Sequence, residues 1–318
     1  MIKIPYTKPF LSLKEQLKQL KDRGLQVEND VKALHLLEVI SYYRLSGYWY
    51  PLLLDKPKHI FKPTATFDTA FKIYCFDREL RKMILSELDK IEVAIRAKAA
   101  YILSETHGPF WFQDSNLFKN PVTFAKSLVS IASEYDRSDA EFVSAFKDKY
   151  SNPLPASWMI MEITSFGSLS MLYKNLKGSK EKREIAHYFG LADTVFQTWL
   201  HSIVYLRNVC AHHSRLWNRN MSIQPEMPKT PHKQWLQYTN ISTKKTYFIL
   251  CMINYLLQTV NPKNTFKNRF RDMIEDYPNI DVKAMGFPID WDKESLWKIQ
   301  EKGLSRPEKS FTYVSPKN

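Results

Sequence analysis

The sequence is poor in cysteine and glycine. Its three cysteines, Cys75, Cys210 and Cys251, lie far apart and form no C-x-x-C pair among 318 residues. This spacing excludes a disulfide framework and a cysteine-based zinc site, and it predicts small buried thiols in a reducing compartment. Eight glycines are few for an architecture that depends on tight hairpin turns, so the composition favours helices.

Long apolar runs are also missing. The N-terminal MIKIPYTKPF has no apolar stretch of signal-peptide length. The most apolar segment, YFILCMINYLL at 247–257, is too short to cross a bilayer and contains Asn254. The sequence therefore predicts a soluble, cytoplasmic protein with no membrane association, in which this segment forms a buried helix.

Several catalytic motifs are absent too. There is no G-x-S-x-G elbow and no glycine-rich loop that could cradle a phosphate. No internal repeat, low-complexity block or run of alternating strand pattern occurs. We expect no cofactor.

Positive charge is what the chain has in excess. The formal net charge is +13, while 44% apolar and 14% aromatic residues argue for a folded globule. Residues 201–245 hold seven basic residues and one acid, Glu226. The basic residues are Arg207, Arg215, Arg219, Lys229, Lys233, Lys244 and Lys245. A solvated charged face could account for such a run, but a run centred on a histidine-rich motif favours a surface for nucleic acid.

Helical periodicity dominates the rest of the chain and predicts an all-α fold of packed antiparallel helices. Ser12 and Glu15 form a capping-box pattern, and Thr66 is a candidate cap for the longest helix, at about 67–103. Other helices are expected at about 30–46, 121–150, 156–176, 180–189, 193–206, 241–260 and 263–276. This pattern predicts an N-terminal helical region (1–65), a main helical domain (66–277) and a loosely structured C-terminal tail (278–318).

The stretch LRNVCAHHSRLWNR at 206–219 gathers arginines and two adjacent histidines without an acid. On a helix His212 and His213 would point about 100° apart, whereas helical two-histidine metal sites prefer i, i+4 spacing, so we expect no metal site. Cys210 lies two residues from His212, on the wrong side of a helix for activation as a nucleophile.

Metal-independent RNA cleavage suits these residues better. RNA carries its own nucleophile, the 2′-hydroxyl, and histidine can act as base or acid near neutral pH. An arginine fork binds phosphate oxygens and keeps its charge. Arg207 and His212 lie about 140° apart on an ideal helix, so they converge only if the helix ends there or a second chain completes the site. Asn208 is i, i+4 from His212 and could orient its ring.

Arg207-x-x-x-x-His212, with Asn208 directly after the arginine, resembles the R-x4–6-H signature of the HEPN superfamily of ribonucleases. The longer block RNVCAHHSRLWNR resembles the Abi-like branch (abortive infection, AbiD/AbiF type). Further similar blocks occur in family order: ISYYRLSGYWYPLL (40–53), FDRELRKMILSELDKIEVAIR (76–96), WMIMEITSFGSLSMLY (158–173) and AMGFPIDW (284–291). The resemblance covers nearly the whole chain.

This resemblance implies a HEPN-like bundle with a four-helix core, preceded by an N-terminal helical extension. It also implies a homodimer that pairs two motifs, metal-independent endoribonuclease activity, and a bacterial anti-phage role. Arg207, His212 and Asn208 would be catalytic, although His213 also satisfies the permitted spacing. Members of this type are associated with a small non-coding RNA, so a non-catalytic RNA-binding protein is the alternative. The phage trigger is not predicted.

Two further groups of residues are candidates for the site. We expect RNA contacts from His213, Arg215, Arg219, Lys244 and Lys245, with Arg215 and Arg219 on one helical face. Glu92 and Arg96 are i, i+4 and could support the site or form an intrahelical ion pair. Glu162 lies in an apolar stretch, so we expect a buried acid paired with Arg207 or Arg96.

Overall fold

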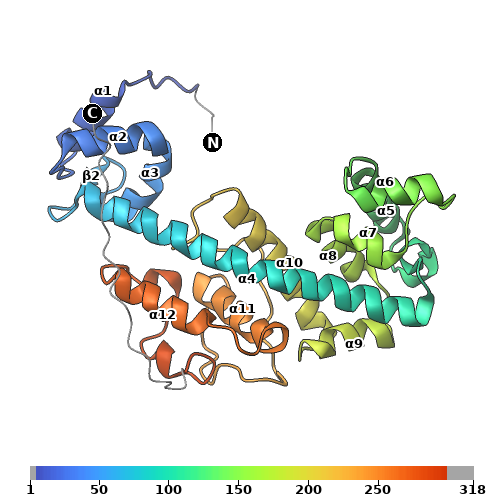
Figure 1. Ribbon diagram of the computed structural model, residues 1–318. Coiled ribbons are helices and arrows are strands. Elements are labelled where there is room, and N and C mark those ends of the chain that lie inside the picture. The colour runs from blue at the N-terminus through green and yellow to red at the C-terminus, as the bar shows by residue number, and fades with distance from the viewer. Residues whose placement is uncertain (1–4, 299–318) are drawn as a thin grey trace.

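The computed structural model describes residues 5–298, and helices dominate it, which confirms the predicted all-α class (Figure 1). The chain begins with α1 (Leu13–Asp22), α2 (Asp30–Ile40) and α3 (Tyr42–Trp49). The capping box predicted at Ser12 and Glu15 is present at the start of α1. A short antiparallel pair, β1 (Leu53–Asp55) and β2 (Ile60–Phe61), follows where the sequence pattern showed no strand.

Helix α4 (Phe67–His107) runs across the whole molecule (Figure 1). Its 41 residues give it a length of about 60 Å. Thr66 caps it as predicted, since its hydroxyl accepts the N–H of Thr69 at 2.9 Å. Gly108 caps the C-terminal end of the helix with a φ of +78°, a conformation that glycine adopts without a steric cost. One side of α4 carries a buried apolar stripe that includes Leu80, Ile84, Leu88, Ile91 and Ile95.

The next part of the chain forms more, shorter helices than the periodicity predicts. The helix expected at 121–150 is divided into α5 (Pro121–Asp136) and α6 (Glu141–Lys149). The helix expected at 156–176 is divided into α7 (Ser157–Ile163) and α8 (Phe166–Asn175). The second division arises because Thr164 is extended and the Ser165 hydroxyl caps α8 through the N–H of Ser168. Helix α9 (Lys180–Tyr188) follows.

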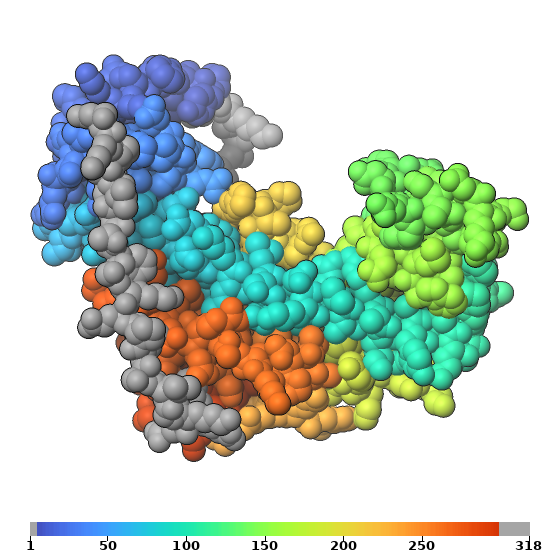
Figure 2. Space-filling view, in the orientation of Figure 1, coloured from blue at the N-terminus to red at the C-terminus, as the bar shows by residue number. Residues whose placement is uncertain are grey.

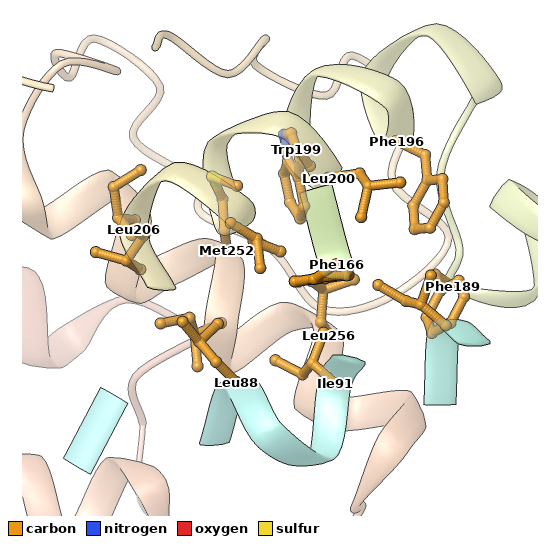
Figure 3. Packing of buried hydrophobic residues seen from close by; sticks show 14 of the residues in the cluster. Leu88, Ile91, Phe166, Phe189, Phe196, Trp199, Leu200, Leu206, Met252 and Leu256 are labelled. Carbon is orange, nitrogen blue, oxygen red and sulfur yellow. The ribbon is translucent and has the colours of Figure 1, made fainter. Parts of the chain in front are cut away.

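The principal core lies between α4, α8, α10 (Asp193–Ala211) and α11 (Thr246–Val260). Figure 3 shows Leu88 and Ile91 of α4 facing Trp199 and Leu206 of α10, with Met252 of α11 between the helices. All of these side chains are buried, so the hydrophobic effect holds the helices together here. Residues 241–245, expected as helix, precede α11, and α12 (Phe266–Asp276) follows it.

The described part of the predicted tail, residues 278–298, has only short 3-10 turns at Lys283–Met285 and Trp291–Lys293. Its apolar side chains nevertheless enter the core, and Met285, Leu296 and Trp297 are buried. The Glu294 carboxylate fixes this segment by accepting the backbone N–H groups of residues 237 and 238. Residues 299–318 of the predicted tail lie outside the described part of the chain.

Two lobes rise from opposite ends of α4. The N-terminal lobe (α1–α3 with the β1–β2 hairpin) has its own apolar core and packs on the start of α4, while α5–α8 gather near its other end. Figure 2 shows a hollow between the two lobes, with the C-terminal end of α10 and the residues after it, coloured gold, rising into it. Within residues 5–298, no helix combines the length and apolar character that a membrane span requires.

Candidate functional site

Helix α10 ends inside the arginine–histidine stretch, at Ala211. The Ser214 N–H donates to the Val209 carbonyl at 3.0 Å, and the His213 N–H donates to the Cys210 carbonyl at 3.0 Å. These two bonds define a Schellman motif, in which the residue after the cap adopts a left-handed conformation. That residue is His213, with a φ of +55°. Glycine usually occupies this position, so the backbone of the motif is held in a strained state.

The last turns of α10 separate apolar from polar side chains. Leu206, Val209 and Cys210 are buried, whereas Arg207, Asn208, His212 and His213 are exposed. Arg207 lies in the last turns of the helix, and His212 is its C-cap residue. Among the described residues, neither of these two side chains has a hydrogen-bond or ion-pair partner. Both remain available to a ligand.

The spacing of Asn208 suggested that its side chain orients the His212 imidazole. The Asn208 backbone carbonyl accepts the His212 N–H at 2.9 Å, and no hydrogen bond of its side chain to the ring is present within residues 5–298. Asn208 therefore contributes to the helix end through its backbone.

The N-terminal lobe holds the turn after α10 in place. Arg44 of α3 donates to the His213 carbonyl at 2.6 Å, and Arg215 donates to the Gly47 carbonyl at 2.5 Å. These bonds join segments almost 170 residues apart in sequence. The sequence reasoning missed Arg44, and nothing in its local pattern marks it, since the contact depends on how α3 packs.

A buried polar network lies beneath the same turn. Asp77 of α4 is fully buried and accepts the backbone N–H groups of Leu216 and Trp217, at 3.1 and 2.6 Å from its Oδ1. It also accepts the Tyr48 hydroxyl at 2.7 Å and forms an ion pair with Arg81. Asp77 thereby ties α3, α4 and the chain after the motif together. This pair was also missed, although two charges at i, i+4 inside the apolar stripe of α4 are a signal for it.

Burial governs the titration of this network. It raises the pKa of Asp77, while the Arg81 guanidinium and the donated hydrogen bonds oppose the rise. Burial also raises the pKa of the nearby Cys210 thiol to about 12. The thiol therefore stays protonated at neutral pH, which agrees with its expected role as a small buried side chain. Cys251 is buried, Cys75 is half-buried, and all three cysteines are unpaired.

The predicted RNA contacts are distributed differently from the expected helical face. Arg215 and Arg219 follow the end of α10, so the prediction that they share one face of a helix is wrong. Instead, Arg219 donates to the Tyr205 hydroxyl at 3.1 Å and to the Arg215 carbonyl at 3.2 Å. Lys244 is exposed, whereas Lys245 is half-buried and its side chain lies against Gly286.

The three supporting residues do not form the expected arrangement. Glu92 and Arg96 make an intrahelical ion pair, and the Arg96 guanidinium also donates to the carbonyls of Met161 and Thr164 at the end of α7. The prediction that Glu162 is buried is wrong, because it is exposed, and within residues 5–298 no ion pair joins it to Arg207 or Arg96, although Glu162 and Arg96 line the same cavity. Arg96 thus satisfies carbonyls at the end of α7 and joins this helix to α4.

In the part of the chain that the structure describes, no three His, Cys, Asp or Glu side chains lie close enough together to hold a metal ion.

Comparison with known proteins gives a family match over the region that contains this site. A protein-family model described as "Abi-like protein" matches residues 35–218, which is more than half of the chain. The matched region includes Arg44, Asp77, Arg81 and nearly all of the 206–219 stretch. No curated protein and no solved structure matches this chain.

Proposed function

Because the chain belongs to the Abi-like family, we propose that it is a metal-independent endoribonuclease of an abortive-infection defence system. Family membership associates the chain with abortive infection. The ribonuclease activity and the assignment to the HEPN superfamily are the proposed part. They rest on the chemistry of the residues at the end of α10.

One observation carries the proposal: Arg207 and His212 are exposed and have no hydrogen-bond or ion-pair partner among residues 5–298, and they lie at the end of a helix that many contacts hold in place. The Schellman turn, the Arg44 bond and the buried Asp77 network all fix the backbone around them. The fixed backbone lowers the entropy cost of binding at this position, and the two side chains remain able to contact a ligand.

The proposed reaction uses the 2′-hydroxyl of RNA as nucleophile. His212 takes the proton of this hydroxyl while its oxygen attacks the adjacent phosphorus. The P–O5′ bond breaks, and the leaving 5′-oxygen receives a proton from a second imidazole. Arg207 donates to the non-bridging oxygens and stabilises the charge that develops on the phosphate. The products are a 2′,3′-cyclic phosphate end and a 5′-hydroxyl end.

We place the second imidazole on a second copy of the chain. A two-fold axis beside the end of α10 would bring two copies of Arg207 and His212 around one phosphate. His213 of the same chain is the other candidate acid, since it is adjacent to His212 and exposed. The proposed unit is therefore a homodimer with RNA as substrate.

Incubation of the purified protein with total RNA in EDTA, followed by mapping of the ends, tests the activity. We expect cleavage that persists in EDTA and leaves 2′,3′-cyclic phosphate or 3′-phosphate ends. His212→Ala should reduce cleavage by about 10²-fold or more, as loss of acid–base catalysis does. His201→Ala is the matched control, because His201 is also exposed on α10.

Strict Mg²⁺ dependence with 5′-phosphate products would contradict the proposed mechanism. RNA binding without cleavage would favour the alternative, a non-catalytic protein that assembles with a small non-coding RNA.

A further inference from the structure

The chain that follows α10 turns back and runs along the same helix. Ser222 lies against Tyr205, with 3.4 Å between the two hydroxyl oxygens. Farther along, the Glu226 N–H donates to the Thr198 hydroxyl at 3.0 Å. Because later residues of this segment meet earlier residues of α10, residues 214–226 run antiparallel to the helix and lie along one edge of it.

This return brings an arginine and a tyrosine into contact beside the helix. Arg219 donates from Nε to the Tyr205 hydroxyl at 3.1 Å, and its guanidinium carbon lies 5.7 Å from the centre of the Tyr205 ring. The contact therefore combines a hydrogen bond with a cation–π interaction. Arg219 also donates from Nη1 to the Arg215 carbonyl at 3.2 Å. Bonds from two of its nitrogens fix the plane of the guanidinium.

The Arg219 guanidinium keeps its charge and most of its donors. A guanidinium has five N–H donors, and two of them are used in these bonds. Within residues 5–298 no carboxylate forms an ion pair with Arg219, and the side chain is partly exposed. The only acid among residues 201–245 is Glu226. Arg219 is therefore available to an anion such as a phosphate group.

Tyr205 lies on the same face of α10 as His212. The two residues are seven positions apart, which is about 20° short of two full turns of an ideal helix and about 10 Å along its axis. Arg207 lies about 140° from His212, toward the other edge of the exposed face. The face that carries His212 therefore has an arginine at each edge, Arg207 on one side and Arg219 on the other.

We propose that Arg219 binds a neighbouring phosphate of the RNA strand that is cleaved at His212, and that Tyr205 is the positioning residue that holds Arg219 in place. This inference rests on the proposed function and adds a second phosphate contact to the same site. A strand bound at His212 carries a phosphate on every nucleotide, so a short length of it reaches the level of Tyr205. A guanidinium whose plane is fixed binds phosphate oxygens with little further loss of entropy.

Binding of a short single-stranded RNA at a series of salt concentrations, measured by fluorescence anisotropy, tests the proposal. All proteins carry His212→Ala, so the strand stays intact. Arg219→Ala should weaken binding by about ten-fold or more, because it removes a charge-assisted contact. It should also flatten the slope of log K against log salt by about 0.7, the value for one phosphate contact of a single strand.

Two conservative variants separate positioning from charge. Tyr205→Phe keeps the ring and removes the hydroxyl that accepts the Arg219 bond. We expect binding to weaken by about three-fold with an unchanged salt slope, because the charge of Arg219 remains. Arg219→Lys should likewise retain the slope while it loses the Nε donor. Since Tyr205 acts through Arg219, Tyr205→Phe should have no further effect in proteins that carry Arg219→Ala or Arg219→Lys.

The N-terminal lobe offers a matched control. Arg23 donates to the Tyr42 hydroxyl, also at 3.1 Å, and both side chains are partly exposed. Arg23→Ala and Tyr42→Phe should leave the affinity for RNA and the salt slope unchanged. The proposal is overturned if RNA does not bind, if Arg219→Ala binds it as the control variants do, or if Tyr205→Phe weakens binding equally with and without Arg219.

Cleavage assays on the same variants with His212 restored separate this proposal from the ribonuclease activity. We expect Arg219→Ala and Tyr205→Phe to raise KM more than they lower kcat, since the contact lies away from the reacting bonds. If RNA binds as expected but is not cleaved, the ribonuclease proposal fails and the Arg219 contact stands. If RNA is cleaved with the same KM by both variants and the wild type, the Arg219 contact fails and the ribonuclease activity stands.

Discussion

At the scale of single residues, the most unusual conformation near the site is that of His213. Its φ of +55° places it in the left-handed region, which costs a residue with a side chain about 1–2 kcal/mol relative to a right-handed one. The Schellman hydrogen bonds and the Arg44 bond hold it there. The strained conformation makes the His213 imidazole a candidate for a role in the site.

His213→Gly tests this role. We expect the free energy of unfolding to rise by about 0.5–1 kcal/mol, because the relief of strain exceeds the extra entropy of glycine in the unfolded chain. RNA cleavage should fall at the same time. His59→Gly is the control, since His59 has the same φ of +55° in the β1–β2 turn. It should gain stability without losing cleavage. Equal cleavage by both variants would assign His213 a purely structural role.

Asp77 is the residue on which the support of the motif depends most. Asp77→Ala removes the partner of the buried Arg81 and leaves the N–H groups of residues 216 and 217 unsatisfied. We expect a loss of about 3–5 kcal/mol in the free energy of unfolding, measured by urea denaturation. The double variant Asp77→Ala/Arg81→Met should lose less than the sum of the single changes. Additive losses would show that the two side chains do not act as a pair.

At the scale of elements, a buried lysine connects α8, α9 and α10. Lys182 of α9 is 2% exposed, and its ammonium group donates to the Leu176 carbonyl at the end of α8 and to Gln197 of α10. Burial, together with the positive charge of Lys119, lowers the pKa of Lys182 to about 8. The ordinary pKa of lysine in an unfolded chain is about 10.4. Between these two values the unfolded state binds more protons than the native state.

The stability contributed at this position should therefore rise with pH between about 8 and 10.4. The measurement is the difference in the free energy of unfolding between the wild-type protein and Lys182→Met at a series of pH values. We expect the wild type to become more stable relative to Lys182→Met as the pH rises from about 8 to 10.4. The other titrating groups are common to both proteins, so their effects cancel in the difference. A difference that stays constant over the window would show that Lys182 titrates normally in the fold.

At the scale of the whole molecule, the hollow between the two lobes exposes the end of α10 (Figure 2). A partner chain or an RNA strand could reach the site from this side, because both lobes leave it open. In the proposed homodimer, the hollows of the two chains would face each other, and so would the two copies of the 206–219 stretch. In that arrangement each active site needs residues from both chains.

Mixed dimers test this arrangement. Wild-type protomers are combined with an excess of His212→Ala protomers, and cleavage is measured per wild-type chain. If the site is composite, mixed dimers should lose nearly all activity. The proposed reaction needs His212 from both chains, and a mixed dimer supplies only one. Activity that stays proportional to the wild-type protomers would show that each chain works alone. Size-exclusion chromatography with light scattering confirms that the variant still forms dimers.

The sequence by itself determined the features that depend on short-range physics. Helical periodicity placed α4 and α11 because apolar residues recur every 3.6 positions on a buried face. The caps at Ser12 and Thr66 were predictable because a hydroxyl binds a backbone N–H only three residues away. The 206–219 stretch was recognisable for the same reason, since its residue types lie within fourteen consecutive positions.

Only the tertiary structure decided what depends on packing between distant segments. Arg44 reaches His213 across 169 positions, and Asp77 reaches Trp217 across 140. Such contacts follow from the angle at which α3 and α4 meet the end of α10, and no local pattern encodes that angle. The exposure of Glu162, within an otherwise apolar stretch, was likewise decided by how the helices pack. Burial, which decides whether a charge is paired or free, is a property of the packed molecule.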